Sequence, residues 1–424
     1  MTNEPEAKKI DRARFVKLAG AGAGAVAAWQ LAAPASARAA SVIPLSVGVM
    51  VPTGSSYSSM GRSLLDGLTL GFDEARSSTR PVNATLVQRE VERGYSGALA
   101  TATSLLDGGS DVVVAGISGL VANRIGSLFS TRQASLVVAN VGAHLVPPAA
   151  RNPFVLHNSL LYWQASYAAG QWAAASLGKQ AFIASSQRDS GYDSIYAFRR
   201  GFEAAGGSIV GEQVTHADPR DSGLSTLFAA VRSSGATVLY GVYSGAPAAE
   251  FVRAHAAAGT GAKLVAGSLA VEDYQLSTVG TASLGVTTCA SWTLGRTSRA
   301  NQSFAKTFKT KFGRVPDPFA AVGYDTAALV AEGARRATQK GYGLRRLIEA
   351  LGGASLDGPR GTLTVDSGSN SVKGSLWLRQ VKQTKTGLAN VDVTQLAAVD
   401  SFPGALASLA DGTVAGYVNE YLCA

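Results

Sequence analysis

Hydroxyl-bearing side chains gather in one short loop near the start of the chain. The loop, 52–59, contains five Ser or Thr residues and follows an apolar run, 45–51. After it, Leu64, Leu68 and Phe72 recur every four residues, which is typical of an amphipathic helix, whereas the run before it is strand-like. The first N–H groups of a helix lack internal partners and carry partial positive charge. The loop therefore offers donors to a carboxylate or carbonyl; an ordinary strand–helix turn is the alternative.

The elements that follow alternate between strand and helix patterns. Apolar runs at 111–115 and 135–140 are separated by helical stretches, and a second series of the same kind occupies 164–267. Alternation with short links indicates parallel sheets covered by helices on both faces. We therefore expect two α/β units in a row, and we expect 358–366 and 374–382 to form a final strand pair.

In open α/β sheets, ligands bind outside the carboxyl ends of the strands. The loops at these ends are predicted at 116–119, 140–143, 186–192, 241–245 and 268–270. In the first unit the Ser118 hydroxyl and the N–H groups of Gly119 and Gly142 suit a carboxylate or carbonyl. The alternative is that Ser118 only caps the following helix, since Ser is favoured at that position.

Composition and motifs exclude several function classes. The 424 residues are 46% hydrophobic and 16% charged, which indicates a globular chain with room for two cores. The net charge is +9, but no Lys/Arg block is interleaved with aromatic residues, so we expect no nucleic-acid binding. The four His lack metal-ligand spacing, 116–120 misses the nucleophile-elbow pattern, and no phosphate-binding loop is present. We expect neither an enzyme nor a cofactor or metal site.

The start of the chain resembles a known family. Pro52-Thr53-Gly54, Gly61, Gly67 and the acidic pair 73–74 follow one another as in the type I periplasmic solute-binding proteins, the leucine/isoleucine/valine-binding protein family. Ser55 stands where that family usually has Pro, and the Leu between Pro and Thr is missing. The resemblance extends from about 42 to about 382.

The resemblance implies an α/β, two-lobed periplasmic-binding-protein type I (Venus-flytrap) fold, each lobe a mostly parallel sheet with helices on both faces. By resemblance, lobe 1 comprises 40–157 and 287–366, and lobe 2 comprises 158–286 and 367–424. It implies a monomer that captures a small polar or carboxylate-bearing molecule between the lobes and delivers it to an ABC transporter permease, its only contact with the membrane. A ligand sensor serving a signalling partner and a secreted α/β enzyme are the alternatives.

The strand-end loops and the resemblance together give a candidate ligand site. Its residues are Ser55, Ser56, Tyr57, Ser118, Gly119, Val141, Gly142, Trp163, Tyr192, Tyr243, Ser268 and Leu269. The aromatic members would suit a flat or apolar ligand body, although Trp163 is equally read as a core residue of its helix. Amino-acid-binding members hold the ammonium group with an acid and a Thr, and here Leu269 and Ala143 occupy those places. Glu272 and Asp273 are the nearest acids.

The first 39 residues have the three regions of an export signal. A basic segment precedes an apolar run at 18–33, and small residues before Ala40 predict cleavage near Ala39 and a periplasmic location. Residues 11–17 resemble a twin-arginine motif, but Ala13 replaces the second Arg, which leaves the export route open. Cys289 and Cys423 either form a disulfide in that oxidising compartment or remain a buried and a free thiol.

Overall fold

A computed structural model describes residues 41–54, 58–91, 94–145, 151–187, 189–190, 193–216, 223–397 and 399. The predicted export signal lies outside these residues. So do five other predicted residues: Ser55, Ser56, Tyr57, Tyr192 and Cys423.

The first sheet has the strand order β11-β12-β13-β5-β4-β3-β1-β2. Its strands are β1 (Ile43–Val51), β2 (Val82–Glu90), β3 (Val112–Ala115), β4 (Ser135–Asn140), β5 (Val155–Ser159), β11 (Ser355–Gly358), β12 (Gly361–Asp366) and β13 (Ser371–Lys373). Strands β1 to β5 are parallel to their neighbours, and only β11, β12 and β13 include antiparallel pairs. All four residues of β3 are buried, as expected for a strand covered on both faces.

The second sheet has the order β15-β14-β10-β9-β8-β6-β7. Its strands are β6 (Gln180–Ser186), β7 (Ser208–Thr215), β8 (Val238–Val242), β9 (Lys263–Ala266), β10 (Thr287–Ala290), β14 (Leu376–Thr384) and β15 (Gly387–Leu396). Strands β6 to β10 pair in parallel, and the hairpin β14–β15 adds an antiparallel edge.

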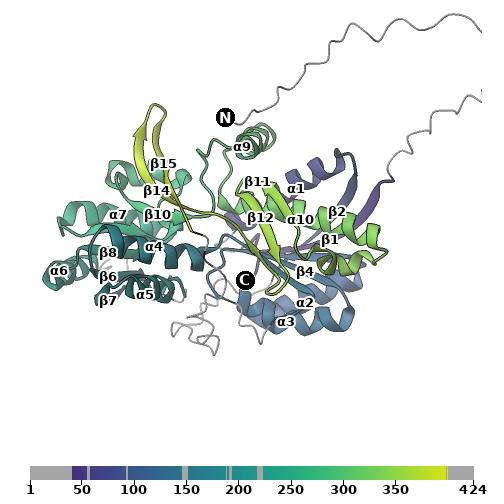
Figure 1. The fold of residues 1–424 in the computed structure, drawn as a ribbon, viewed down its shortest axis with the longest axis horizontal. Coiled ribbons are helices and arrows are strands. Elements are labelled where there is room, and N and C mark those ends of the chain that lie inside the picture. The colour runs from purple at the N-terminus through teal and green to yellow at the C-terminus, as the bar shows by residue number, and fades with distance from the viewer. Residues whose placement is uncertain are drawn as a thin grey trace, which may run out of the picture. The chain divides into compact units, whose positions relative to one another are not determined.

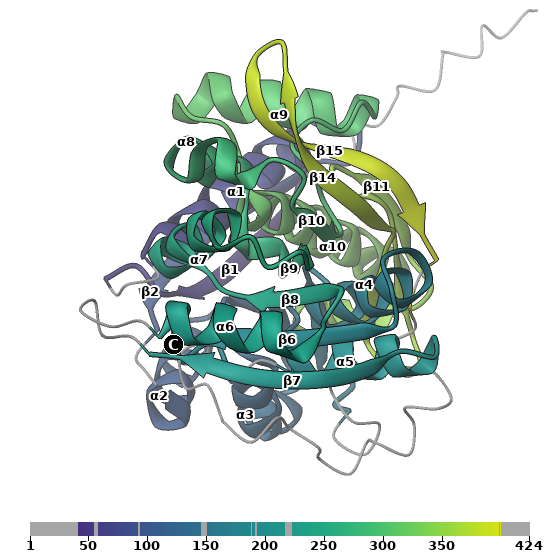
Figure 2. The ribbon, with the colours of Figure 1, turned by 90° about the vertical axis from the view of Figure 1, so that its left-hand side faces the viewer.

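Helices cover both faces of each sheet (Figures 1 and 2). They are α1 (Ser58–Arg76), α2 (Gly94–Asp107), α3 (Gly119–Arg132), α4 (Tyr162–Ser176), α5 (Ser194–Ala204), α6 (Leu224–Ser234), α7 (Gly245–Ala258), α8 (Leu276–Val279), α9 (Arg299–Phe312), α10 (Pro318–Lys340) and α11 (Leu347–Leu351). In the first sheet α1 and α10 share one apolar core and α2 and α3 another; in the second, α4 and α5 lie opposite α6 and α7. The predicted fold class is confirmed: two lobes, each a mostly parallel sheet between helices.

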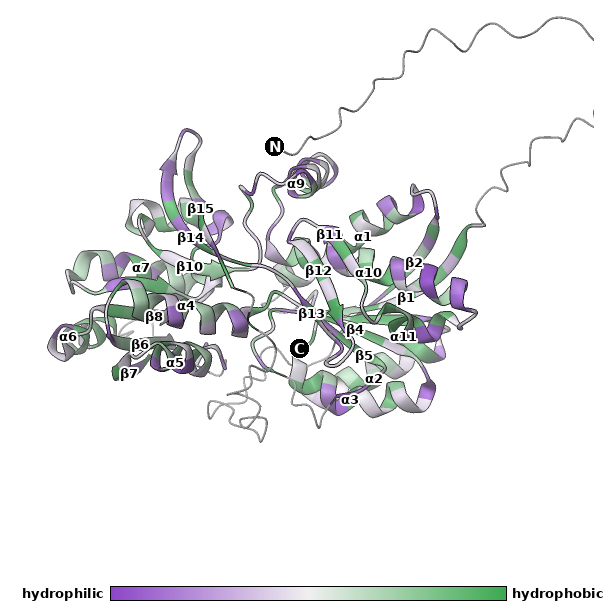
Figure 3. Cartoon of the chain, in the orientation of Figure 1, coloured by the Kyte–Doolittle hydropathy of each residue, from purple (hydrophilic) through white to green (hydrophobic). Residues whose placement is uncertain are grey.

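Hydropathy follows these layers. Figure 3 shows hydrophobic residues along the strands and hydrophilic ones on outer helix surfaces such as that of α9. In α9 only Asn301, Phe304 and Phe308 are buried, a spacing of three and four residues that gives one buried face.

Two expectations about the C-terminal third differ from the structure. Strand β10, expected at the start of a lobe 1 segment, pairs with β9 and β14 in the second sheet. The prediction that 358–366 and 374–382 pair with each other is wrong. Strand β12 pairs with β11 and β13 in the first sheet, whereas β14 belongs to the second. The chain therefore crosses from the first sheet to the second after β5, returns after β10, and crosses a third time between β13 and β14. Sequence pattern identifies strands, but it does not identify their partners.

Glycines allow α1 and α10 to pack closely. A Cβ at Gly67 would lie 2.1 Å from the carbonyl oxygen of Ala320, and one at Gly323 would lie 2.3 Å from that of Leu64. Backbone on both sides leaves no side chain to move aside. The two helices therefore depend on glycine at this crossing.

We expect Gly67→Ala to lower the free energy of unfolding by about 1–3 kcal/mol, because the added methyl group overpacks the crossing. Urea denaturation measures the change. Gly343→Ala is the matched control, since a Cβ there meets nothing within 4 Å, and we expect a change within about 0.5 kcal/mol. Equal effects of the two substitutions would contradict the prediction.

Candidate functional site

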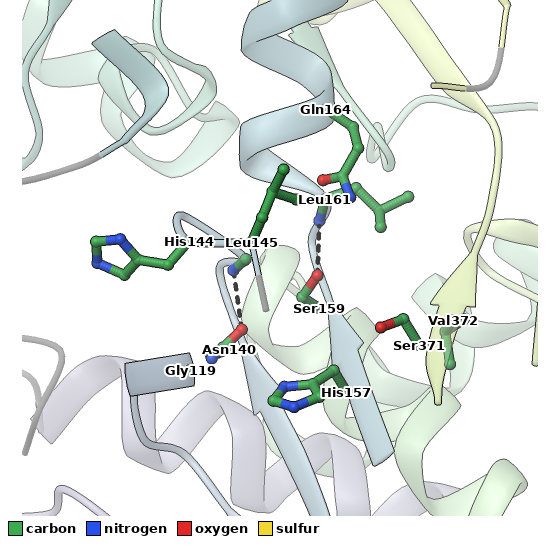
Figure 4. Close-up of a pocket in the computed structure, with 11 residues that line it drawn as sticks. Gly119, Asn140, His144, Leu145, His157, Ser159, Leu161, Gln164, Ser371 and Val372 are labelled. Atoms are coloured by element: carbon green, nitrogen blue, oxygen red, sulfur yellow. Dashed lines mark hydrogen bonds between the residues drawn. The ribbon is translucent and has the colours of Figure 1, made fainter. Parts of the chain in front are cut away.

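A small pocket lies at the carboxyl ends of β3, β4 and β5 (Figure 4). Its volume is about 30 Å³, enough for a group of one or two heavy atoms. It is lined by Gly119, Asn140, Gly142, His144, Leu145, His157, Ser159, Leu161, Gln164, Ser371 and Val372. Gly119 and Gly142 are therefore the predicted site residues that the structure brings together here.

Asn140 fixes the two first-lobe loops that reach the pocket. Its Nδ2 donates to the carbonyl oxygen of Ile117 at 2.8 Å, and its Oδ1 accepts from the Gly142 N–H at 2.9 Å. The Gly142 N–H, expected to face a ligand, is thus engaged within the protein. Gly142 has φ +72°, and a Cβ there would lie 2.3 Å from Ser159 Oγ. This turn requires glycine for both reasons.

Ser118 caps helix α3, as the alternative prediction held. Its Oγ accepts from the Val121 N–H at 3.2 Å, and the residue is 1% exposed. The cap places the N-terminus of α3, with its partial positive charge, beside the pocket wall formed by Gly119. A ligand contact by Ser118 stays a prediction.

Several hydrogen bonds fix the first crossing between the lobes, which is the segment between β5 and α4. Ser159 Oγ accepts from the Leu161 N–H at 3.2 Å, and Ser291 Oγ donates to the Leu160 carbonyl oxygen at 2.9 Å. Leu161 has φ +57°, a left-handed conformation that costs a non-glycine residue about 1–2 kcal/mol. Its surroundings hold the conformation, and helix α4 starts at the next residue.

One side-chain pair joins a first-lobe loop to the second lobe. His144, which follows β4, places Nδ1 2.9 Å from Oδ2 of Asp193, the residue before α5. The two side chains are 3% and 11% exposed. A contact this well shielded from water ties the end of the first sheet to α5.

Arg379 engages Glu272, one of the two acids nearest to the place where amino-acid-binding members of the family hold an ammonium group. Its guanidinium is fully buried in β14 and contacts both carboxylate oxygens of Glu272. It also donates to the Ser268 carbonyl oxygen at 2.9 Å and to Thr288 Oγ1 at 2.8 Å. Burial raises the pKa of Glu272 to about 7, and the neighbouring guanidinium opposes this rise. Glu272 is therefore part of an internal ion pair.

The other second-lobe acids at the strand ends are also engaged. Asp189 is 1% exposed and accepts from Ser186 Oγ at 2.7 Å. It also accepts from the N–H of Ser244 at 2.9 Å and from its Oγ at 2.8 Å. This links the loops after β6 and β8. Asp273 accepts from the backbone N–H of Asn390 at 3.1 Å.

The remaining predicted residues lie at strand ends but are largely buried. Tyr243 stacks on Phe251 at 4.0 Å between ring centroids, and its hydroxyl lies 3.1 Å from Thr215 Oγ1; burial raises its pKa. Trp163 is 3% exposed and stacks on Tyr167. Val141 is also buried, whereas Ser268 and Leu269 are each 9% exposed in a short turn after β9.

Sequence reasoning missed most of the polar pocket lining: Asn140, His144, His157, Ser159, Gln164 and Ser371. Asn140 ends a predicted strand, and Gln164 is a polar residue in the first turn after the first crossing, so each carried a usable sequence signal. Ser371 carried none, because its strand is three residues long and lies far along the chain.

The buried acids predict a pH dependence of stability. Burial raises the pKa of Glu272 from 4.5 to about 7 and that of Asp325 from 3.8 to about 6. Each folded carboxyl therefore holds a proton over a range in which the unfolded one has lost it, and stability falls as pH rises through that range. We expect Glu272→Gln to flatten the fall between pH 5 and pH 7 in urea denaturation. A variant with an unchanged slope would contradict this.

A family model described as periplasmic binding protein matches residues 44–387. The chain belongs to the periplasmic binding protein family. "Leu/Ile/Val-binding protein homolog 6" of Brucella melitensis is 24% identical over 375 residues, covering 86% of this chain and 93% of the relative. An ABC transporter substrate-binding protein from Sphaerobacter thermophilus has the same fold, with a TM-score of 0.77, 23% identity, and coverage of 85% of this chain and all of the other.

A second solved structure of this fold is a solute-binding protein of an ABC transporter from Rhodopseudomonas palustris BisB5 in complex with 3,4-dihydroxybenzoic acid. The TM-score is 0.72 and the identity 20%, over 84% of this chain and 98% of the other. The family model describes binding proteins, and the two solved structures are substrate- or solute-binding proteins of ABC transporters. None of the helices in the described part is long and apolar enough to cross a membrane, and the described residues contain no cluster of metal-ligating side chains.

Proposed function

We propose that this binding protein captures a small molecule that carries a carboxylate or amide beside an aromatic or apolar body and lacks a free α-amine. It delivers this molecule to the permease of an ABC importer. The observation that supports the proposal is the state of the second-lobe acids: Glu272 is held by Arg379, Asp189 by two serines, and Asp193 by His144.

The argument rests on the cost of burying an ammonium group. A buried cation without a carboxylate partner is strongly destabilised. Recruiting Glu272 would break its pair with Arg379, and breaking a buried pair by removing one partner costs about 3–5 kcal/mol. A ligand without an amine avoids this cost altogether.

The first lobe has features that favour a ligand with an acidic group. The N-terminus of α3 carries partial positive charge, which favours an anionic group. Trp163 and Tyr243 are buried at the strand ends and make this region apolar and aromatic. The dihydroxybenzoic acid complex of the relative from R. palustris shows the same fold holding an aromatic acid. Binding energy that favours the closed arrangement of the lobes then drives closure about the crossings.

Calorimetry with matched pairs tests the ligand class. We expect 4-methylpentanoate and benzoate to bind and leucine, which adds an α-amine to the first acid, to bind at least tenfold more weakly. Tight binding of leucine with no binding of either acid would show the proposal wrong and direct attention to Glu272 or Asp273.

Ser118→Ala is expected to weaken the bound acid more than tenfold, a loss of at least about 1.4 kcal/mol, because a charge-assisted hydrogen bond disappears. The substitution also removes a helix cap, which costs about 1 kcal/mol of stability. Ser298→Ala is the matched control, since Ser298 caps α9 through the Asn301 N–H. Equal affinities of the two variants would contradict a contact by Ser118.

We further propose that the protein is a periplasmic monomer whose mature chain begins near Ala40. N-terminal sequencing of exported protein tests the cleavage site, and an intact Met1 would refute it.

Analytical ultracentrifugation tests whether the protein is a monomer. Thiol titration without reductant tests the predicted pairing of Cys289 with Cys423, and two free thiols would exclude it.

A further inference from the structure

Gln164 stands out among the residues that line the pocket beside the first crossing. It lies in the first turn of α4, is 6% exposed, and reaches toward Leu161 and Ser159 (Figure 4). Its Oε1 has no hydrogen-bond partner among the residues that the structure describes. An acceptor buried without a partner costs about 1–3 kcal/mol.

The side chains of Asn140 and Ser159, which also line the pocket, already have backbone partners. Asn140 is held by Ile117 and Gly142, and Ser159 Oγ accepts from Leu161. Gln164 is therefore the amide in the lining whose acceptor the fold leaves unused. A buried amide of this kind recognises a group that donates a hydrogen bond.

The charges of the residues that line the pocket indicate whether that group is neutral or ionic. Burial lowers the pKa of His157 to about 4, so its imidazole is neutral at neutral pH. The other imidazole in the lining, that of His144, already has the Asp193 carboxylate as its partner. The pocket is thus polar, and its lining offers no unpaired charge. A neutral hydroxyl group suits these surroundings better than an ion.

We propose that this pocket is a subsite for a hydroxyl group of the bound solute and that Gln164 is the residue that selects it. The inference rests on the proposed function, since the solute's acid group is assigned to the adjacent α3 terminus. Gly119 and Gly142 line the pocket and also belong to the strand-end loops, so one molecule reaches both places. The volume of about 30 Å³ admits a group of one or two heavy atoms but no second ring.

Calorimetry on the full chain tests this, with benzoate compared with its 2-, 3- and 4-hydroxy derivatives. We expect at least one hydroxy acid to bind the wild-type protein about tenfold to a hundredfold more tightly than benzoate, because it gives the buried amide its partner. In Gln164→Met, which keeps the length of the side chain, we expect this preference to vanish while benzoate affinity stays within about threefold. Gln164→Leu repeats the test should the first variant fold poorly.

Gln383→Met is the matched control, because Gln383 is exposed on the β14 strand of the edge hairpin, and we expect it to keep the wild-type preference. Equal binding of benzoate and every hydroxy acid by the wild-type protein would overturn the subsite while leaving the proposed function intact. A preference that survives in both Gln164 variants would overturn the role of Gln164. Failure of all four acids to bind would overturn the proposed ligand class and this inference with it.

Discussion

Replacing Arg360 with methionine is expected to lower the free energy of unfolding by about 3–5 kcal/mol. Arg360 is fully buried in the turn between β11 and β12. Its Nε donates to Asp325 Oδ2 at 2.6 Å, its Nη2 to Asn158 Oδ1 at 2.5 Å, and its Nη1 to the carbonyl oxygen of Ser159. Without the guanidinium, the Asp325 carboxyl and two acceptors of the first crossing lose their donor in a site closed to water. Urea denaturation measures the loss.

Two further variants distinguish the contribution of the ion pair to stability from that of side-chain packing. Arg360→Met combined with Asp325→Leu removes both charges, and we expect it to recover much of the loss, because apolar replacement of a whole buried pair is often neutral. Arg346→Met removes an exposed arginine paired with Glu349, and we expect no measurable change in the free energy of unfolding. A loss below about 1 kcal/mol for Arg360→Met alone would show that the pair contributes little.

The second large effect concerns ligand affinity as well as stability. We expect Arg379→Met to destabilise the protein by about 3–5 kcal/mol and to weaken solute binding more than tenfold. Arg379 connects β14 to the loop after β9 through the Ser268 carbonyl oxygen and Glu272. Removing it frees the loop that carries Ser268 and Leu269, two of the predicted ligand contacts.

Denaturation and calorimetry on the same Arg379→Met sample distinguish the two effects. Arg379→Met with Glu272→Met is expected to restore part of the stability, yet not the affinity, because the loop still lacks its anchor. Reduced stability with unchanged affinity would show that the loop after β9 makes no contribution to binding.

Strands and helices with a strong pattern could be predicted from the sequence. The run at 111–115 corresponds to β3, that at 135–140 to β4, and the recurrence of Leu64, Leu68 and Phe72 to α1. Each pattern arises from burial against neighbouring layers, so residues close together in the sequence are enough to reveal it. The same locality explains why Ser118 and Gly119 were placed correctly at the end of a strand.

Long-range pairings could not be predicted. Glu272 and Arg379 are 107 residues apart, and Asn158 and Arg360 are 202 residues apart. No local pattern distinguishes a buried arginine with a partner from an exposed one, so the sequence alone does not reveal that Glu272 is held by Arg379. The sheets that β12 and β14 join depend in the same way on contacts between distant parts of the chain.

The close packing of α1 against α10 has a consequence for the order in which the protein is completed. Ser63 of α1 donates to Asp317 Oδ2, the cap of α10, at 2.5 Å across 254 residues. At about 5–20 residues per second, ribosomes need roughly 13–50 s to make the chain between them. During that time α1 cannot pack against α10, because α10 has not yet been synthesised. Translation alone therefore keeps the first lobe unfinished until most of the second has emerged.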